Sequence, residues 1–133
     1  MSFLFADTFY FLALLSPQDA GHLKAQQFGE KNDRPLLTTS WVLTEVADGL
    51  ADTRNRHLAR QLYFDLQNDP LDQVVSATQK LFERGLALYD NRPDKNWSLT
   101  DCISFVVMQD HGITEALTAD RHFEQAGFVP LLV

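Results

Sequence analysis

Four acidic residues, separated by 38, 56 and 19 positions, stand where expected strands end or expected helices begin. They are Asp7, Glu45, Asp101 and Asp120. An ionised side chain at the end of a buried element is costly unless something binds it. At about 5 Å and an effective dielectric constant near ~20, each pair of like charges costs roughly 3 kcal/mol. We therefore expect these acids to bind a ligand rather than to stabilise the fold.

Carboxylate oxygens, with no cysteine or histidine among the ligands, favour a hard cation such as Mg²⁺ or Mn²⁺. A cation of this kind positions a phosphate group and lowers the pKa of a bound water molecule. It also stabilises the negative charge that develops when a phosphodiester is cleaved. This is the chemistry of metal-dependent nucleases, so the four acids predict a site of that class.

The elements that must position the acids alternate between short apolar runs and helical patterns. Strands are expected at Phe3–Ala6, Leu36–Thr39, Gln73–Val75, Ala116–Thr118 and Phe128–Val133. Helices are expected at Thr8–Leu15, Pro17–Glu30, Trp41–Leu50, Asp52–Gln67 and Thr78–Tyr89, from Ser98 through the apolar run Cys102–Met108, and from Arg121. This alternation predicts one α/β domain over residues 1–133, with a mostly parallel central sheet of four to five strands flanked by helices.

In a parallel sheet, functional groups gather beyond the carboxyl ends of the strands. Asp7 directly follows the first expected strand, and Asp120 lies just past the fourth. Glu45 is in the second turn of the helix after the second strand, and Asp101 is in the first turn of its helix. The predicted fold therefore allows the four carboxylates to converge on one edge of the sheet.

Each acid also has a purely structural interpretation. Asp7 and Asp120 could each cap the helix that follows. The run Ser98–Asp101 is a capping-box pattern with Asp in place of Glu, so Asp101 could simply accept helix amides. Glu45 could be an ordinary solvated helix residue. The coincidence of all four at one sheet edge favours the metal site over the four separate explanations.

The composition limits the class of protein and its setting. The formal net charge is −7 and the pI is about 4.8, which argues against a general nucleic-acid binder but not against an enzyme that meets phosphates through cations. The single cysteine, Cys102, allows no internal disulfide, and a reducing, cytoplasmic location is expected. The apolar stretch Phe3–Leu15 has no basic leader and is too short for a membrane span, so no membrane association is expected.

With these residues placed, the chain resembles the PIN-domain ribonucleases, and most closely the stand-alone bacterial PIN proteins of the VapC toxin type. That family opens with a hydrophobic strand, an Asp, a Ser or Thr and an apolar helix, which here is FLFADTFYFLALL. Its second acid is a Glu in the helix after the second strand, here TTSWVLTEVADGL. Its third and fourth acids lie in a Ser/Thr-x-Thr-Asp helix start and a Thr-x-Asp-x-x-Phe pattern, here SLTDCISFVVM and LTADRHFEQAGF. The four fragments occur in order and cover nearly the whole chain.

The resemblance implies that Asp7, Glu45, Asp101 and Asp120 are the catalytic and metal-binding acids, with the hydroxyls of Thr8 and Thr100 beside them. It implies Mg²⁺- or Mn²⁺-dependent hydrolysis of RNA by a metal-activated water, without a covalent enzyme intermediate. It also implies a homodimer and, for VapC-like members, the toxin of a toxin–antitoxin system that is inhibited by a small antitoxin protein.

Basic and aromatic residues outside the acid pattern are less decisive. Arg54, Arg56 and Arg121 are candidates for contact with the RNA backbone, and a solvated surface is the alternative for each. His122 is interpreted as a surface group. The single residues Trp41 and Trp97 are expected to pack at the edges of the protein rather than to stack on bases.

Three other classes of protein compete with this hypothesis. A receiver domain would need paired acids after the first strand and a lysine near the last, but Asp7 stands alone and no lysine follows Lys95. A phosphatase of the haloacid dehalogenase type would need a second Asp at the position of Phe9. A PIN-like nucleic-acid or protein binding module, with weak or no nuclease activity, remains the main alternative.

Overall fold

The computed structural model describes residues 2–133. Its centre is a sheet of five strands in the order β3-β2-β1-β4-β5. The strands are β1 (Leu4–Ala6), β2 (Leu36–Thr39), β3 (Gln73–Val75), β4 (Glu115–Leu117) and β5 (Val129–Pro130). Every pair of neighbours runs parallel. The prediction of an α/β fold with a largely parallel sheet is therefore confirmed.

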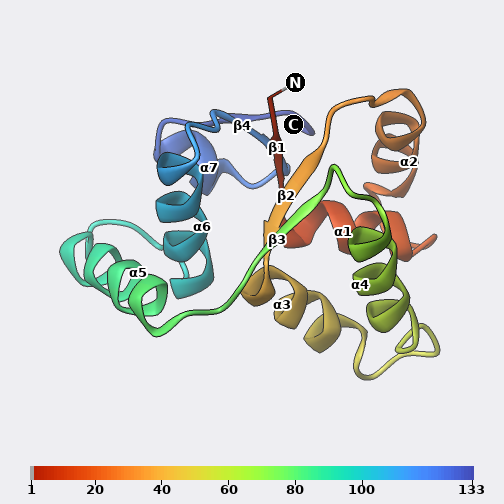
Figure 1. Cartoon of the computed structure of the whole chain (residues 1–133), viewed down its shortest axis with the longest axis horizontal. Helices are drawn as coiled ribbons and strands as arrows, with labels where there is room; N and C mark the ends of the chain where they lie inside the picture. Colours follow the sequence, from red (N-terminus) through yellow and green to blue (C-terminus); the bar gives the residue numbers. More distant parts are fainter. Residues whose placement is uncertain (1) are drawn as a thin grey trace.

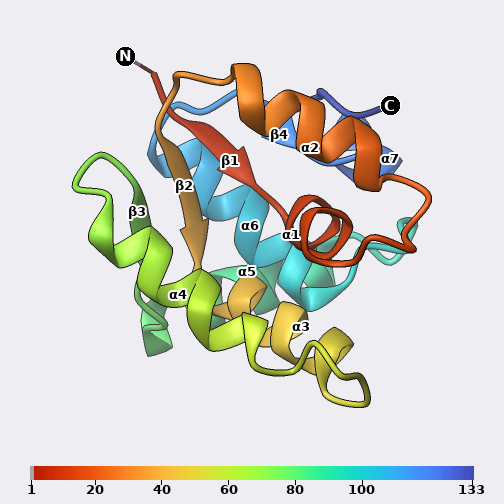
Figure 2. The same cartoon turned by 90° about the vertical axis from the view of Figure 1, so that its right-hand side faces the viewer.

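Helices cover both faces of this sheet. They are α1 (Thr8–Leu15), α2 (His22–Lys31), α3 (Ser40–Leu50), α4 (Leu58–Asn68), α5 (Gln79–Asn91), α6 (Leu99–Asp110) and α7 (Arg121–Gln125). In Figure 1, α5, α6 and α7 lie on one side of the strands and α1, α2 and α4 on the other. Figure 2, seen from the side of α2 and α4, shows α6 behind β1 and β2. The layers are thus helix, sheet and helix.

The core is organised around β1 and α6. All three residues of β1 are fully buried, as expected for the central strand of a parallel sheet that is covered on both faces. Residues 101–108 of α6 are also buried without interruption. The Phe105 ring meets the edges of Trp97 and Phe123, with ring centroids 5.1 and 5.0 Å apart. Trp97 is 6% exposed and packs inside the core, so its expected position at the edge of the protein is wrong.

The contact between α5 and α6 is unusually close at Gly85. A methyl group on Gly85 would overlap the Cγ1 atom of Ile103 and lie 3.2 Å from its Cα atom. Only glycine permits this approach, because any side chain would push the two helices apart. The close packing fixes α6, and with it the position of Asp101 at the start of that helix.

Two predicted helices begin later than the sequence suggested. The helix predicted from Pro17 begins at His22, because the Asp19 carboxylate accepts a hydrogen bond from the backbone of Gly21 in a preceding turn. The helix predicted from Asp52 begins at Leu58. The Thr53 hydroxyl there donates to the backbone carbonyl of Leu50, which favours a turn over helix continuation.

The predicted last strand, Phe128–Val133, is also wrong in its length. Only Val129 and Pro130 pair with β4. The Leu131 and Leu132 amides still donate to the Ala116 and Thr118 carbonyls, but the chain beyond Pro130 turns instead of continuing as a strand. The remaining predicted elements lie within two residues of the observed ones.

Candidate metal centre

Asp7 and Asp120 follow β1 and β4, the neighbouring strands between which the strand order of the sheet reverses. From β1 the chain adds β2 and β3 on one side, whereas β4 and β5 lie on the other side of β1. The crevice beyond the strand ends at such a reversal is where ligands bind in open α/β sheets. Asp7 directly follows β1, and Asp120 lies three residues after Leu117, the last residue of β4.

Asp7 does not cap the helix that follows it. Its carboxylate makes no capping hydrogen bond to α1 and instead accepts one from the hydroxyl of Thr118, at 2.9 Å. The residue is only 5% exposed. Burial raises the pKa of Asp7 to about 7, and the negative charges of Asp101 and Glu45 act in the same direction, against the backbone N–H of Thr8 and the hydroxyl of Thr118. A buried acid of this kind needs a cation beside it to be ionised without cost.

Asp101 is both a helix cap and a member of the site. The Ser98 hydroxyl accepts from the backbone N–H of Asp101 at 3.0 Å, and Asp101 Oδ2 accepts from the backbone of Ser98 at 3.3 Å. This is a complete capping box. The second oxygen, Oδ1, makes no hydrogen bond within residues 2–133 and remains available to a ligand. Burial raises the pKa of Asp101, with Asp120 adding to the effect and the hydrogen bond from His122 opposing it.

His122 belongs to the site, and its interpretation as a surface group is wrong. Its side chain is 30% exposed, and its Nδ1 atom lies 3.0 Å from Asp101 Oδ2 and 3.4 Å from Asp120 Oδ1. Asp120 caps α7 by accepting from the backbone N–H of His122, which fixes the first turn of that short helix. The sequence did offer one signal for this role of His122. The residue lies two positions after Asp120, and a residue so close to a strand-end acid lies at the same edge of the sheet.

Glu45 faces the same crevice from α3. The Thr39 hydroxyl caps this helix by accepting from the backbone of Val42, so α3 begins directly at the end of β2. Thr8 donates its hydroxyl hydrogen to Glu45 Oε1 over 2.6 Å, as the resemblance implied for a neighbouring hydroxyl. Thr100, the second hydroxyl so predicted, makes no side-chain hydrogen bond within residues 2–133. Thr118 instead supplies the hydroxyl that bonds Asp7.

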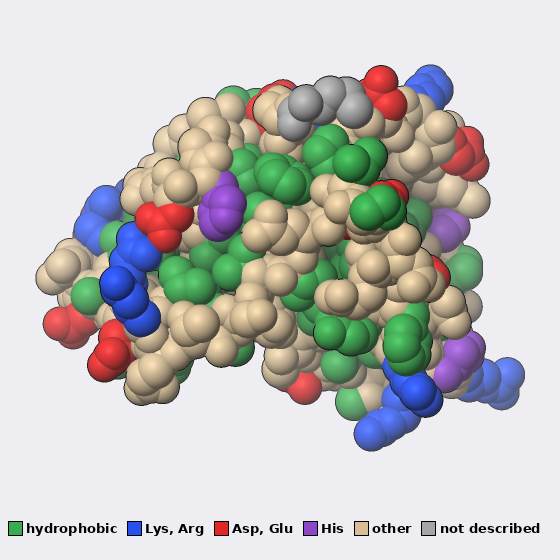
Figure 3. Space-filling model, viewed as in Figure 1, with side chains coloured by type: hydrophobic (Ala, Val, Ile, Leu, Met, Phe, Trp, Pro, Cys, Tyr) green, Lys and Arg blue, Asp and Glu red, His purple; other side chains and the backbone are tan. Residues whose placement is uncertain are grey.

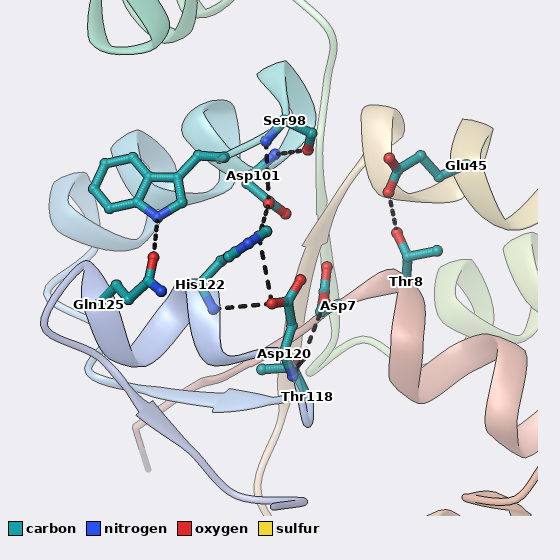
Figure 4. Close-up of polar contacts among 10 residues, drawn as sticks. Asp7, Thr8, Glu45, Ser98, Asp101, Thr118, Asp120, His122 and Gln125 are labelled. Carbon is teal, nitrogen blue, oxygen red and sulfur yellow. Dashed lines mark hydrogen bonds and ion pairs between the residues drawn. The ribbon is translucent and has the colours of Figure 1, made fainter. Parts of the chain in front are cut away.

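The four acids line one cavity of about 540 Å³. Figure 4 shows their side chains directed into the same space from β1, α3, α6 and the start of α7. Single ligand atoms of Asp101, Asp120 and His122 all lie within 4.8 Å of one another, close enough to bind one ion. No lysine or arginine is among the described residues that line the cavity. Four carboxylates with no lysine or arginine to neutralise them fit a divalent cation.

The basic candidates lie outside this cavity. Arg54 and Arg56 are exposed residues of the turns between α3 and α4, not of a helix. Figure 3 shows Lys and Arg side chains gathered over this connection, at the lower right of the face drawn. The side chain of Arg121 is 77% exposed and lies 3.9 Å from Glu124. None of the three lines the acidic cavity, and their contact with RNA stays a prediction.

A family model described as the PIN domain matches residues 4–129. The chain belongs to the PIN domain family. The match includes all four acids, and it confirms the resemblance on which their assignment was based. In this PIN domain, the four acids line the cavity described above, beside the point where the strand order of the sheet reverses.

Two similar proteins carry the name 23S rRNA-specific endonuclease VapC20, from the CDC 1551 and H37Rv strains of Mycobacterium tuberculosis. Each is 29% identical over 126 residues, which cover 95% of this chain and 95% of the relative. The crystal structure of M. tuberculosis VapC20, described as a sarcin-ricin loop cleaving toxin, superposes with a TM-score of 0.87 at 26% identity. The superposition covers 98% of this PIN domain chain and 99% of that one.

The helices of residues 2–133 include none that is both long and apolar enough to cross a membrane. The most apolar one by sequence, α1, has only eight residues and packs Tyr10, Phe11 and Ala13 into the core. The apolar stretch near the amino terminus therefore forms folded structure.

Proposed function

We propose that this protein is a metal-dependent endoribonuclease and the toxin of a toxin–antitoxin pair. The observation that carries the proposal is the convergence of Asp7, Glu45, Asp101 and Asp120 on one cavity with no lysine or arginine among its described lining residues. Similarity over 95% of the chain to a protein named as a 23S rRNA-specific endonuclease supports it.

The cofactor that fits the site is Mg²⁺ or Mn²⁺. The carboxylates offer oxygen ligands, which both ions prefer, and His122 adds a nitrogen that Mn²⁺ accepts more readily than Mg²⁺. Bound in this site, such a cation supplies neutralisation of the phosphodiester and acidification of a water molecule for direct attack, without a covalent enzyme intermediate.

The protein's own residues hold and orient the reactants. In Figure 4, the Asp101 carboxylate lies above the carboxylates of Asp120 and Asp7, and the Thr118 hydroxyl holds Asp7. Glu45 is held by Thr8, so that one of its oxygens stays directed at the cavity. We propose that the joint role of these fixed carboxylates is to bind the cation and to position water.

The substrate we propose is RNA, and the first RNA to test is a hairpin with the sequence of the sarcin–ricin loop of 23S rRNA. The choice follows the descriptions of the similar proteins. Arg54, Arg56 and Arg121 are exposed and are proposed to contact the RNA backbone at a distance from the acids. The net charge of −7 makes such local cations necessary for an RNA to approach.

We further propose a homodimer, inhibition by a small antitoxin and a cytoplasmic location. The α4 residues Tyr63 and Phe64 are each 44% exposed, and exposed aromatic side chains are frequent at protein–protein interfaces. By contrast, Tyr10 and Phe11 of α1, also considered for a partner surface, are buried in the core. Analytical ultracentrifugation of the pure protein, alone and with the product of any small adjacent reading frame, tests both kinds of association.

The test of the enzymatic proposal is cleavage of the labelled hairpin. We expect cleavage with Mg²⁺ or Mn²⁺, none with EDTA, and loss of activity in Asp7→Asn and Asp101→Asn. Asp48→Asn is the matched control, because Asp48 is an exposed acid on the same helix as Glu45 and does not line the cavity. Cleavage that persists in both site variants would refute the assignment of the acids.

The alternative function, a PIN-like binding module, predicts a different result in the same experiment. Such a protein would bind Mn²⁺ and RNA but leave the RNA intact under every condition. Mn²⁺ binding followed by electron paramagnetic resonance, together with RNA binding by fluorescence anisotropy, separates a binding module from an inactive preparation.

A further inference from the structure

A second cavity adjoins the acidic one and has a different chemistry. It has a volume of about 420 Å³ and lies between the C-terminal end of α5, residues 92–98 and α6. We call it the α5–α6 cavity. Asn96 lines both this cavity and the acidic one, and the consecutive residues Asp101 and Cys102 each line one of them. An RNA strand bound across the four acids could therefore extend past Asn96 into the α5–α6 cavity.

One wall of the α5–α6 cavity is rigid. The Trp97 indole donates a hydrogen bond to Gln125 Oε1 at 3.0 Å and packs edge-on against Phe105. The Arg92 guanidinium stacks 5.0 Å above the Trp97 ring and forms two 3.0 Å hydrogen bonds with the carboxylate of Asp94. Arg92 covers a face of the indole while Gln125 and Phe105 hold it in place, so Arg92 and Trp97 shape the wall and leave recognition to other groups.

Two lining groups are available to a ligand. Lys95 has no carboxylate within ion-pair distance among residues 2–133, in contrast to Arg92. Tyr89, at the rim, is 50% exposed and presents an aromatic ring. The exposed acid Asp90 also lines the cavity, so an anionic ligand must approach from the side of Lys95. A free ammonium group beside an exposed ring is the combination that holds a phosphate and a stacked base.

We propose that the α5–α6 cavity binds a nucleotide of the RNA that adjoins the scissile phosphate, with Lys95 on its backbone phosphate and Tyr89 against its base. The inference rests on the proposed ribonuclease function, and it names a second site at which the enzyme would contact its RNA substrate. The cavity volume lies in the range of pockets that enclose a small ligand. Lys95 would provide a cation close to a site whose described lining contains four acids and no lysine or arginine.

The first test measures binding of the fluorescein-labelled sarcin–ricin hairpin in EDTA, where no cleavage occurs. We expect Lys95→Glu to weaken binding about tenfold and Lys95→Ala to reduce the salt dependence of binding by roughly one phosphate contact. Lys80→Glu is the matched control, since Lys80 is exposed on the first turn of α5, at the opposite end of that helix. Tyr89→Ala should weaken binding by about fivefold or more and Tyr89→Phe should not, because stacking needs only the ring.

A second readout reports on the cavity itself. In a Trp41→Phe background, Trp97 is the only tryptophan of the chain. RNA should change its fluorescence, and Lys95→Glu should abolish that change at the same RNA concentration. A variant that merely unfolds would instead lose the emission of a buried indole before RNA is added.

The outcomes separate the two proposals. If the wild type cleaves the hairpin while Lys95→Glu binds it as tightly as Lys80→Glu does, the cavity proposal fails and the nuclease proposal stands. If the wild type binds without cleaving, the nuclease proposal fails, and the Lys95 and Tyr89 variants still decide the role of the cavity. If the wild type neither binds nor cleaves RNA, both proposals are wrong.

Discussion

The Nδ1 atom of His122 lies 3.0 Å from Oδ2 of Asp101, and this contact joins the first turn of α7 to the first turn of α6. The ring nitrogen donates, because an ionised carboxylate can only accept. The same Nδ1 atom is 3.4 Å from Asp120 Oδ1, so one imidazole stands between two acids that repel each other. The ring N–H of His122 thus partly offsets the repulsion between Asp101 and Asp120, which a bound cation would also do.

Replacing His122 tests this role. We expect His122→Ala to lower the free energy of unfolding in EDTA by about 1 kcal/mol, the size of a partly exposed hydrogen bond to a charged group. His122→Asn is the control, because the asparagine side chain can also donate to Asp101. Urea denaturation in EDTA, with no ion bound, provides the measurement. Equal losses in Ala and Asn would contradict the hydrogen-bond explanation.

Asp7 should make the metal-free protein less stable as the pH rises. Its pKa is about 7 in the folded protein against an ordinary value of 3.8, so the folded protein binds more protons than the unfolded chain between these values. The free energy of unfolding therefore falls as the pH rises from about 4 through about 7, by up to ~4 kcal/mol. Asp7→Asn should remove this decline and be more stable than wild type at pH 8 in EDTA. Denaturation curves across this pH range measure both effects.

The same titration predicts a pH dependence of metal affinity. Only the ionised carboxylate of Asp7 binds a cation, so Mn²⁺ affinity should rise as the pH increases through 7. Mn²⁺ titrations followed by electron paramagnetic resonance at several pH values test this expectation. An affinity that is flat from pH 6 to 8, in a protein that stays folded, would show that Asp7 is not coupled to the ion.

Thr8 and Thr100 form a matched pair for testing the hydroxyls near the site. Thr8→Val removes the 2.6 Å hydrogen bond that holds Glu45, and we expect Mn²⁺ affinity to fall by about tenfold. Thr100→Val removes no side-chain hydrogen bond within residues 2–133 and should leave the affinity unchanged. Isothermal titration calorimetry of the two variants is the measurement. If Thr100→Val weakens binding as much as Thr8→Val does, the apo geometry does not describe the loaded site.

Gly85→Ala should separate α5 from α6 and disturb the site at a distance. The added methyl group overlaps Ile103, and relieving such a clash in a packed core costs about 1–3 kcal/mol. Thermal denaturation and hairpin cleavage should both be impaired, since α6 carries Asp101. Adding Ile103→Ala to this variant should recover part of the loss by making room, whereas the exposed control Glu83→Ala should have little effect. An unchanged melting temperature in Gly85→Ala would contradict the close packing.

Much of the fold could be predicted from the sequence because its signals are local. The apolar run of β1 and the capping box from Ser98 to Asp101 are read from neighbouring positions, and each lies where the pattern predicts. The late starts of α2 and α4 were missed, because side-chain hydrogen bonds from Asp19 and Thr53 favoured turns over weak helical patterns.

The sequence by itself determined which acids stand at strand ends and in what order along the chain. It could not decide whether Asp7 caps α1 or faces a cavity, because both uses follow from the same position beside a helix start. The pairing of β1 with β4 decided that question by placing the Thr118 hydroxyl against Asp7. The pairing also brought α7 against α6, and His122 between two acids. The Thr118–Asp7 and His122–Asp101 contacts join residues 111 and 21 positions apart, and such distances in sequence are closed only when the sheet and its helices pack.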